Sequence, residues 1–138
     1  MTEFTSETKT LPYSQEKVYG RLSNLESLEK IKGQISSNKI SDLKFERDSF
    51  SCSVSPVGKV KFVIVERKPS QLIQMRVEKS PIDIRVWIQL AASNVNETKM
   101  KLNLKADLNP FIKPMFSKPL QDGVNKVAQL LATIPYNA

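Results

Sequence analysis

The sequence predicts an α+β domain in which a curved antiparallel sheet lies against one long C-terminal helix. Two observations lead to this fold class. Between residues 50 and 108, apolar side chains occupy every second position along a series of short segments, which is the periodicity of strands with one buried face. After this region apolar residues recur at helical spacing, and such a helix can cover the apolar face of a sheet.

Length and composition indicate one globular domain over residues 1–138, with 40% hydrophobic and 25% charged residues. The first ten residues have neither a basic start nor an apolar stretch. The longest strongly apolar run, Phe62–Val65, is far shorter than the roughly 20 residues of a membrane span. A single cysteine fits a reducing compartment. We therefore expect a cytoplasmic protein with no integral membrane association.

The first third of the chain predicts one strand and two short helices. The strand is expected at Glu3–Leu11, where threonines raise the β-propensity, and Pro12 ends it. The two helices should together cover Ser14–Lys32, ending near Gly33. Ser14 is a suitable N-cap for the first helix, and Asn24 for the second.

Six further strands should follow, separated by turns rich in proline, glycine, serine and asparagine. They are expected at Leu43–Arg47, Ser49–Val54, Lys59–Glu66, Leu72–Glu78, Ile82–Ala92 and Thr98–Asp107. Because the connections are short, neighbouring strands should pair antiparallel as a meander. With the first strand they form a curved seven-stranded antiparallel sheet.

The last helix is expected to begin at Asn109, a capping residue followed by a proline. Pro114 and Pro119 predict a break or a kink in its first part. From Pro119 to Ile134 the apolar stripe is regular, and this stretch extends about 24 Å at 1.5 Å per residue. The helix is therefore long enough to lie across the sheet.

The residues that usually carry catalysis are scarce. The chain contains no histidine, so it lacks the usual general base at neutral pH and the usual zinc ligand. Its four glycines are isolated, and none belongs to a phosphate-binding loop. Cys52 occupies an inward position, where a thiol behaves as a small hydrophobe. The sequence thus predicts no catalytic residue, no metal site and no cofactor, and it favours a protein that is not an enzyme.

The net charge of +7 does not by itself indicate nucleic acid as a partner. The lysines are scattered over nearly every predicted element and are not interleaved with aromatic residues, as single-strand binding requires. We expect no nucleic-acid binding. Trp87 has the opposite parity to Val86 and Ile88, so it either faces outward and marks a protein-binding surface or sits at a β-bulge or beneath the first helices.

The space between sheet and last helix is the candidate ligand site. Its expected lining residues are the inward apolar side chains Phe62, Met75, Val86, Ile88, Met100, Leu102, Leu104, Phe116, Leu120, Val124 and Val127. Ser6 and Thr8 share parity with Phe4 and are candidate polar contacts for one end of an apolar guest. The alternative is a fully packed core with these hydroxyls near its rim, because periodicity does not distinguish filled space from a cavity.

The order of one strand, two short helices, a six-strand meander and a long C-terminal helix resembles the helix-grip fold of the START and birch-pollen-allergen superfamily. Leu11–Tyr19 resembles the superfamily pattern of strand end, proline, cap and amphipathic helix, and Leu22–Leu28 resembles the junction to the second helix. Lys99–Leu102 and Leu108–Phe111, leading to Lys118–Leu120, are similar to small bacterial members often labelled polyketide-cyclase-like. The resemblance covers essentially the whole chain.

This resemblance implies an elongated cavity that holds lipids, sterols, polyketides or plant hormones. Some members are cyclases or dehydratases, and others bind proteins, including activators of a heat-shock chaperone ATPase. Catalysis would need polar residues at cavity positions, where this sequence has apolar ones. The leading hypothesis is therefore non-enzymatic binding of a small hydrophobic or amphipathic molecule, such as a lipid, an isoprenoid or a polyketide-like compound. The alternatives are a protein-interaction module that uses the outer sheet face near Trp87, and a cyclase- or dehydratase-type enzyme.

Overall fold

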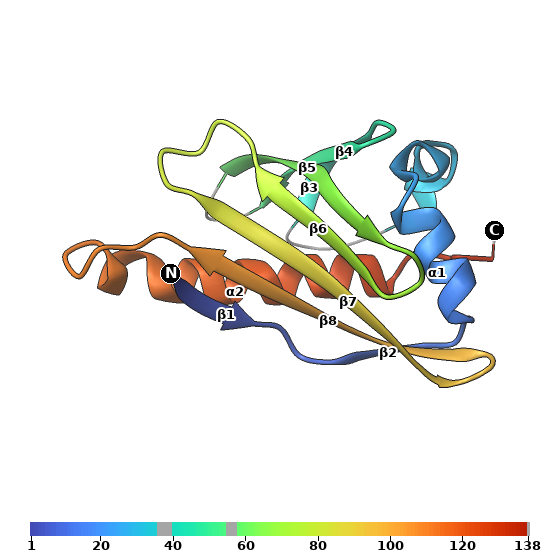
Figure 1. Cartoon of the computed structure of the whole chain (residues 1–138). Helices are drawn as coiled ribbons and strands as arrows, with labels where there is room; N and C mark the ends of the chain where they lie inside the picture. Colours follow the sequence, from blue (N-terminus) through green and yellow to red (C-terminus); the bar gives the residue numbers. More distant parts are fainter. Residues whose placement is uncertain (36–39, 55–57, 138) are drawn as a thin grey trace.

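An open antiparallel sheet curls around the C-terminal helix in the computed structural model, which describes residues 1–35, 40–54 and 58–137 (Figure 1). The strands are β1 (Thr2–Thr5), β2 (Lys9–Leu11), β3 (Ile40–Phe45), β4 (Ser49–Val54), β5 (Gly58–Lys68), β6 (Leu72–Val77), β7 (Ile84–Asn94) and β8 (Glu97–Ala106). The helices are α1 (Gln15–Leu22), the 3₁₀ helix η1 (Leu25–Gln34) and α2 (Lys113–Ala132). Among these helices, none is long and apolar enough to cross a membrane.

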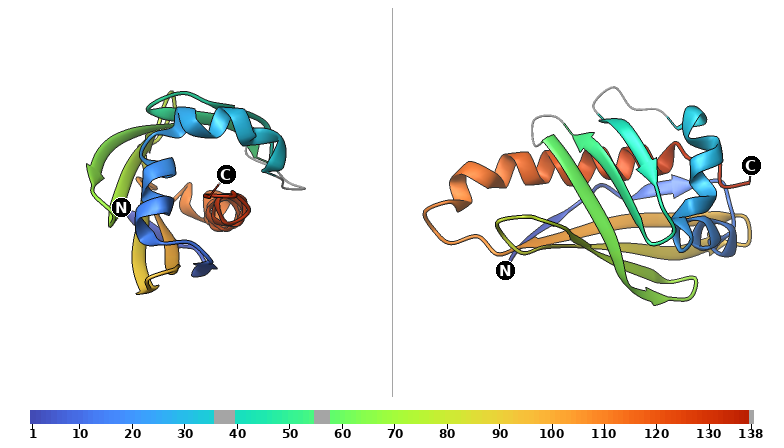
Figure 2. Two further views of the ribbon diagram at one scale, coloured as in Figure 1. Left: turned by 90° about the vertical axis from the view of Figure 1, so that its right-hand side faces the viewer. Right: turned by 90° about the horizontal axis from the view of Figure 1, so that it is seen from above.

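The strands follow the order β1-β8-β7-β6-β5-β4-β3, and β2 continues the β1 edge beside β8. Each neighbouring pair is antiparallel, and for the meander from β3 to β8 the short connections predict this. Viewed along α2, the sheet forms an open trough with the helix on its concave side (Figure 2). The predicted α+β class, curved antiparallel sheet and long C-terminal helix are confirmed.

The first strand is interrupted, which the sequence did not predict. Thr5 pairs with Asn103 and Lys9 pairs with Met100, so the edge contains one more residue than β8 over this interval. Ser6 bridges the interruption, because its Oγ accepts a 2.9 Å hydrogen bond from the N–H of Leu102. The extra residue inverts the alternation of faces.

This inversion determines which of the hydroxyl side chains that share parity with Phe4 are buried and which are exposed. Phe4 and Leu11 are both buried although their positions have opposite parity. Ser6 is buried, but Thr8 and Thr10 are exposed. The expectation of one continuous strand over Glu3–Leu11, with hydroxyls facing inward along it, is therefore wrong beyond Ser6.

The two short helices lie where the sequence places them, although the second is a 3₁₀ helix. Ser14 caps α1, because its Oγ accepts a 3.3 Å hydrogen bond from the N–H of Lys17. Asn24 makes no equivalent side-chain bond at the start of η1. Helices α1 and η1 lie across one end of the trough (Figure 2), and their residues Leu22, Leu25 and Leu28 are fully buried.

Helix α2 begins later than expected and is continuous. Asn109 forms a turn before the helix, since its Oδ1 accepts hydrogen bonds from the N–H groups of Phe111 (2.9 Å) and Ile112 (3.1 Å). The helix then runs from Lys113 through Pro119 as one element, so the break, one of the two predicted alternatives, does not occur. Pro114 lies in the first turn, where a missing N–H costs nothing, and Pro119 removes one backbone bond near an exposed helix end.

The apolar core is closely packed at the end of the trough that α1 and η1 cover. Phe45, Phe50 and Phe62 form a row of rings, with centroids 5.9 Å apart for Phe45 and Phe50 and 4.8 Å for Phe50 and Phe62. Met75, Ile88 and Met100 are also fully buried. The opposite end of the trough is less completely filled.

Candidate functional site

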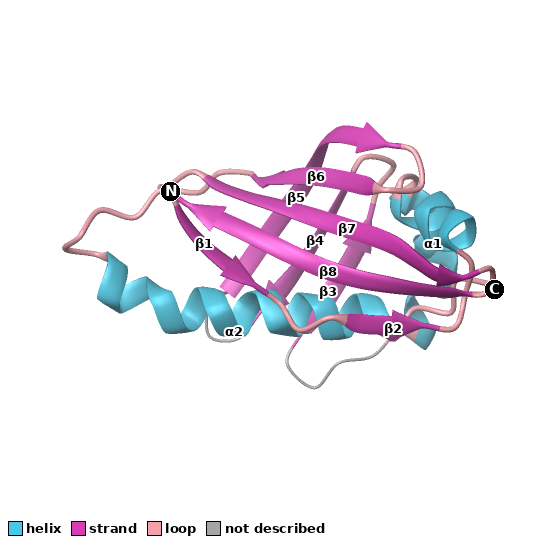
Figure 3. Ribbon diagram, turned by 60° about the horizontal axis from the view of Figure 1, so that its bottom comes forward, coloured by secondary structure: helices cyan, strands magenta, loops and turns pink. Residues whose placement is uncertain are grey.

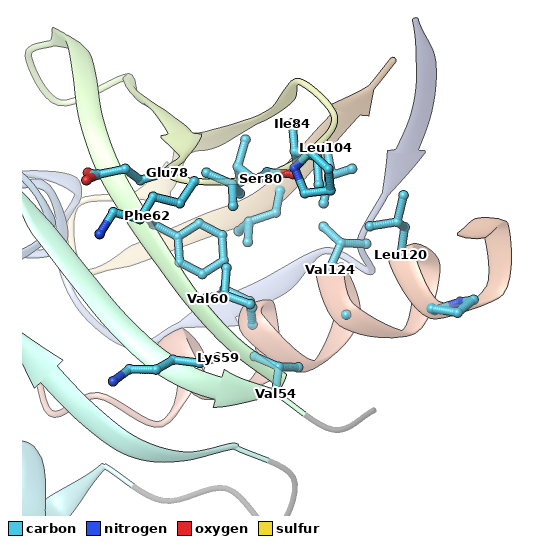
Figure 4. A pocket seen from close by; sticks show the side chains of 18 residues that line it. Val54, Lys59, Val60, Phe62, Glu78, Ser80, Ile84, Leu104, Leu120 and Val124 are labelled. Atoms are coloured by element: carbon cyan, nitrogen blue, oxygen red, sulfur yellow. The ribbon is translucent and has the colours of Figure 1, made fainter. Parts of the chain in front are cut away.

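A cavity of about 240 Å³ lies between the concave face of the sheet and the middle of α2 (Figure 4). Strands β4 to β8 and the turn between β6 and β7 form one side, and one face of α2 forms the other. The lining residues are Val54, Lys59, Val60, Phe62, Val77, Glu78, Lys79, Ser80, Pro81, Ile84, Val86, Leu102, Leu104, Pro119, Leu120, Gly123, Val124 and Val127.

The cavity lies where the middle strands of the sheet stand away from α2. The helix contacts β8, β1 and β2 near one edge of the sheet and β3 at the other edge, whereas β4 to β7 make few contacts with it (Figures 2 and 3). At this level α2 presents small side chains, among them Gly123 and Val124. A Cβ atom added at Gly123 would meet no heavy atom within 4 Å outside its neighbours, so the space beside it is open.

The inner wall of the cavity is almost entirely apolar. Phe62, Leu104 and Val124 face one another across it (Figure 4). The polar lining residues, Lys59 and Glu78 to Ser80, come from the start of β5 and from the β6–β7 turn, and all are at least partly exposed. The volume is somewhat below the roughly 300 Å³ or more that is usual for drug-sized ligands. The arrangement can desolvate a small apolar group, or the apolar end of an amphipath, while a polar end stays at the rim.

The structure brings together most of the lining residues expected from the sequence. Those in the cavity are Phe62, Val86, Leu102, Leu104, Leu120, Val124 and Val127. Met75, Ile88 and Met100 do not line it, because they lie in the packed core. Phe116 is 37% exposed and also lies outside it.

Neither hydroxyl proposed as a polar contact lines this cavity. Ser6 Oγ is occupied by the backbone, since it also donates a 2.9 Å hydrogen bond to the carbonyl oxygen of Glu7. Thr8 is exposed near Trp87 and Lys101 on the convex face.

Several lining residues were missed by sequence reasoning. Val54, Val60 and Ile84 carry the inward parity, so alternation was a signal that could have found them. Gly123 has no apolar side chain to detect, and the rim turn at Glu78 to Pro81 follows no periodic pattern.

Cys52 is fully buried next to this wall, and burial raises the pKa of its thiol to about 11. The thiol is therefore protonated at neutral pH and is a poor nucleophile. In the described part of the chain, no group of three histidine, cysteine or acidic side chains is placed to hold a metal ion.

Trp87 faces the convex side of the sheet. The pairing of β7 with β8 is regular from Ile84 to Ala92, so the alternative of a β-bulge at this position is wrong. Its ring is half-buried, and the Nζ of Lys105 lies 5.3 Å from the ring centroid. This cation–π contact covers part of the ring.

The fold is that of the START and Bet v 1-like helix-grip proteins. Norcoclaurine synthase from Thalictrum flavum superposes with a TM-score of 0.71 at 9% sequence identity, covering 95% of this chain and 91% of that one. A START superfamily protein from Mycobacterium smegmatis superposes with a TM-score of 0.60 at 12% identity, covering 94% of each chain. A protein from Thermus thermophilus gives 0.64 at 16% identity, covering 95% of this chain and 94% of that one. No protein-family model and no curated protein matches the sequence.

Replacing Gly123 with alanine should increase the free energy of unfolding, and the added methyl group should occupy part of the cavity. Gly123→Ala removes the helix penalty of glycine, about 0.5–1 kcal/mol, without a steric clash. Gly20→Ala is the matched control, because Gly20 is also helical, has no atom within 4 Å of an added Cβ, and does not line the cavity. Urea unfolding should show a similar gain for both variants. A loss of stability confined to Gly123→Ala would contradict an open space beside α2.

Proposed function

We propose that this chain binds a small hydrophobic or amphipathic molecule, such as a lipid, an isoprenoid or a polyketide-like compound, without chemically changing it. One observation carries the proposal: the cavity wall is apolar, and the charged lining residues Lys59, Glu78 and Lys79 stand at its rim. Each enclosed CH₂ group contributes about 0.8 kcal/mol, so a five-carbon tail contributes roughly 4 kcal/mol before association costs. Phe62, Val86, Leu102, Leu104, Leu120, Val124 and Val127 supply shape and desolvation.

The same distribution of polar groups argues against an enzyme. General acid–base catalysis needs a titratable group within hydrogen-bond reach of the reacting atoms. Among the described lining residues such groups occur only at the rim. Norcoclaurine synthase is an enzyme, and one of its structures contains dopamine and hydroxybenzaldehyde. The shared fold therefore supports a cavity for small organic molecules, and a cyclase- or dehydratase-type reaction remains the least supported alternative for this chain.

Val124→Trp is the direct test, because the indole would occupy the cavity from the helix side (Figure 4). The probe is 1-anilinonaphthalene-8-sulfonate, whose fluorescence rises in apolar sites, with decanoate as the competitor. The wild-type protein should bind the probe saturably and release it to decanoate. Val124→Trp should weaken binding at least about tenfold, equivalent to about 1.4 kcal/mol.

Gln129→Trp is the matched control, since Gln129 lies on α2 but is exposed and outside the cavity. It should bind the probe as the wild type does. Unchanged binding by a folded Val124→Trp variant would show that the ligand site is elsewhere. Native mass spectrometry of freshly purified protein should also show an adduct of a few hundred daltons that is lost on denaturation.

A protein partner on the convex face near Trp87 is the second candidate. Arg85 lies directly opposite Arg76 on β6 and Lys105 on β8, so three cationic side chains form one row across the sheet. Two acids balance part of this charge, because Arg85 pairs with Asp83 at 3.3 Å and Glu3 on β1 lies opposite Lys105. Like charges directly opposite one another are unfavourable, and an acidic partner would relieve them. Trp87→Ala should then weaken binding of an acidic protein while binding of the apolar probe is unchanged. Weaker binding of the apolar probe by Trp87→Ala, with unchanged binding of the acidic protein, would reject this candidate.

A further inference from the structure

The segment from Leu108 to Lys118, here termed the α2 tip, exposes an unusual number of large apolar side chains. Phe111 is 90% exposed, Met115 is 70% exposed and Phe116 is 37% exposed. These residues lie within six positions of one another, in the loop before α2 and in the first turns of the helix. Surface apolar residues usually occur singly, whereas a group of them marks an interaction site.

The α2 tip projects beyond the sheet (Figures 1 and 3). It emerges at the same end of the molecule as the β6–β7 turn, which forms part of the cavity rim. The helix continues directly from the tip into Pro119 and Leu120, which line the cavity. A surface that contacts the tip would therefore stand beside the mouth of the cavity.

The charge of the α2 tip is entirely positive. Lys113 and Lys118 lie among the exposed apolar residues, and residues 108–121 contain no acidic side chain. The acids that flank the segment, Asp107 and Asp122, precede and follow it. Lys59 and Lys79 add further positive charge at the cavity rim, against Glu78. Lysines interspersed with aromatic and aliphatic residues are the composition of segments that bind anionic membrane surfaces.

The shape of the tip favours a bilayer over a folded protein. Stable protein interfaces are broad and shape-complementary, about 800 Å² on each partner. The tip is a narrow projection made of the first part of α2 and its preceding loop (Figure 3). Its large apolar side chains Phe111 and Met115 are mostly exposed. A lipid interface accepts such side chains without requiring a matching groove, and its phosphate groups complement the lysines.

We propose that the α2 tip docks onto an anionic lipid bilayer, with Phe111, Met115 and Phe116 entering the interface and Lys113 and Lys118 contacting lipid phosphates. Docking would bring the cavity mouth to the membrane surface. The idea that the cavity exchanges its ligand with the bilayer rests on the proposed function. Docking itself requires only the tip.

Vesicle co-sedimentation tests the proposal. The wild-type protein should bind vesicles of phosphatidylcholine mixed with phosphatidylglycerol, should bind phosphatidylcholine alone much less, and should dissociate as salt is added. The double variant Phe111→Ser with Met115→Ser should reduce the partition coefficient at least about tenfold. Lys113→Gln with Lys118→Gln should remove most of the preference for the anionic vesicles.

The matched control is Val65→Ser with Val95→Ser, because these residues are also exposed and apolar but lie outside the tip. This variant should bind vesicles as the wild type does. Failure of the wild-type protein to bind anionic vesicles at low salt would overturn the proposal, as would equal loss in the tip and control variants. Concentration-dependent self-association that disappears in the tip variant, without vesicle binding, would instead assign the tip to a contact between two copies.

Failure of the cavity hypothesis is distinguishable in the same assay. Val124→Trp, which fills the cavity, should retain wild-type vesicle binding. A protein that binds vesicles through the tip but does not bind 1-anilinonaphthalene-8-sulfonate would support docking and reject the ligand cavity. A protein that binds the probe but no vesicle would support the ligand cavity and reject docking of the tip.

Discussion

Phe50→Ala should lower the free energy of unfolding by about 3–5 kcal/mol, the largest effect expected of any single substitution considered for this chain. Phe50 is 1% exposed, and its ring packs between those of Phe45 and Phe62. The substitution removes a buried phenyl group and two ring contacts. Because backbone pairing holds the neighbouring strands, they relax only partly into the gap. Urea unfolding followed by circular dichroism would measure the loss.

Phe111→Ala is the control for this substitution. The chemical change is identical, but Phe111 is 90% exposed and makes little contact with the core. The free energy of unfolding of the Phe111→Ala variant should stay within about 0.5 kcal/mol of the wild-type value. A loss below about 1 kcal/mol for Phe50→Ala would show that the ring cluster is not packed as described.

Alkaline pH should destabilise the fold by several kcal/mol. Burial raises the pKa of the Cys52 thiol from its ordinary value of 9.0 to about 11. The folded state therefore retains a proton that the unfolded state releases, and the unfolded state binds fewer protons above about pH 9. The stabilisation by the neutral thiol is complete below about pH 9 and is lost as the pH rises to about 11. Its magnitude is roughly 2–3 kcal/mol, at about 1.36 kcal/mol per pKa unit.

Tyr136 extends the same trend to higher pH. Its phenol is buried and donates a 2.8 Å hydrogen bond to the carbonyl oxygen of Leu131. Burial, with a smaller effect from Tyr13, raises the pKa of Tyr136 above its ordinary value of 10.0. Because the phenol of Tyr136 loses its proton at a lower pH in the unfolded state than in the folded state, the free energy of unfolding continues to fall above about pH 10.

Denaturant unfolding at a series of pH values, for the wild type and for Cys52→Ala, would test this dependence. The variant should be less stable near neutral pH, because a small buried side chain is lost, but should lose less stability between about pH 9 and 10. Identical pH profiles for the two proteins would contradict a buried, neutral Cys52. Thiol reagents should likewise label the wild type only as fast as it unfolds.

The order and type of the elements could be predicted because each has a local cause. Alternation of apolar residues defined the strands from Phe50 to Leu104, and the Ser14 cap and Pro12 marked the entry to α1. The start of β3 was placed too late, at Leu43 and not at Ile40. Asp42 has a φ of 55° and the pairing with β4 shifts there, which breaks the alternation on which the prediction depended.

The candidate site could be predicted only to the level of a sheet face. Parity places Met75, Ile88, Val86 and Leu104 on the same side of the sheet, and all four are buried. Parity contains no information about position along the trough, so it does not reveal that α1 and η1 fill one end and leave the other open. The exposure of Phe116 likewise depends on where the helix leaves the sheet.

By itself the sequence determined the fold class, the inward apolar faces and the absence of histidine chemistry, because composition and periodicity are local properties of the chain. The tertiary structure alone decided three features: the inversion of faces at Ser6, the continuity of α2 through Pro119, and the cavity beside Gly123. Each of these depends on contacts between segments far apart in the sequence. The extra edge residue near Ser6 depends on how the edge pairs with β8. The cavity depends on the distance between α2 and the sheet, and no single segment of the sequence determines that distance.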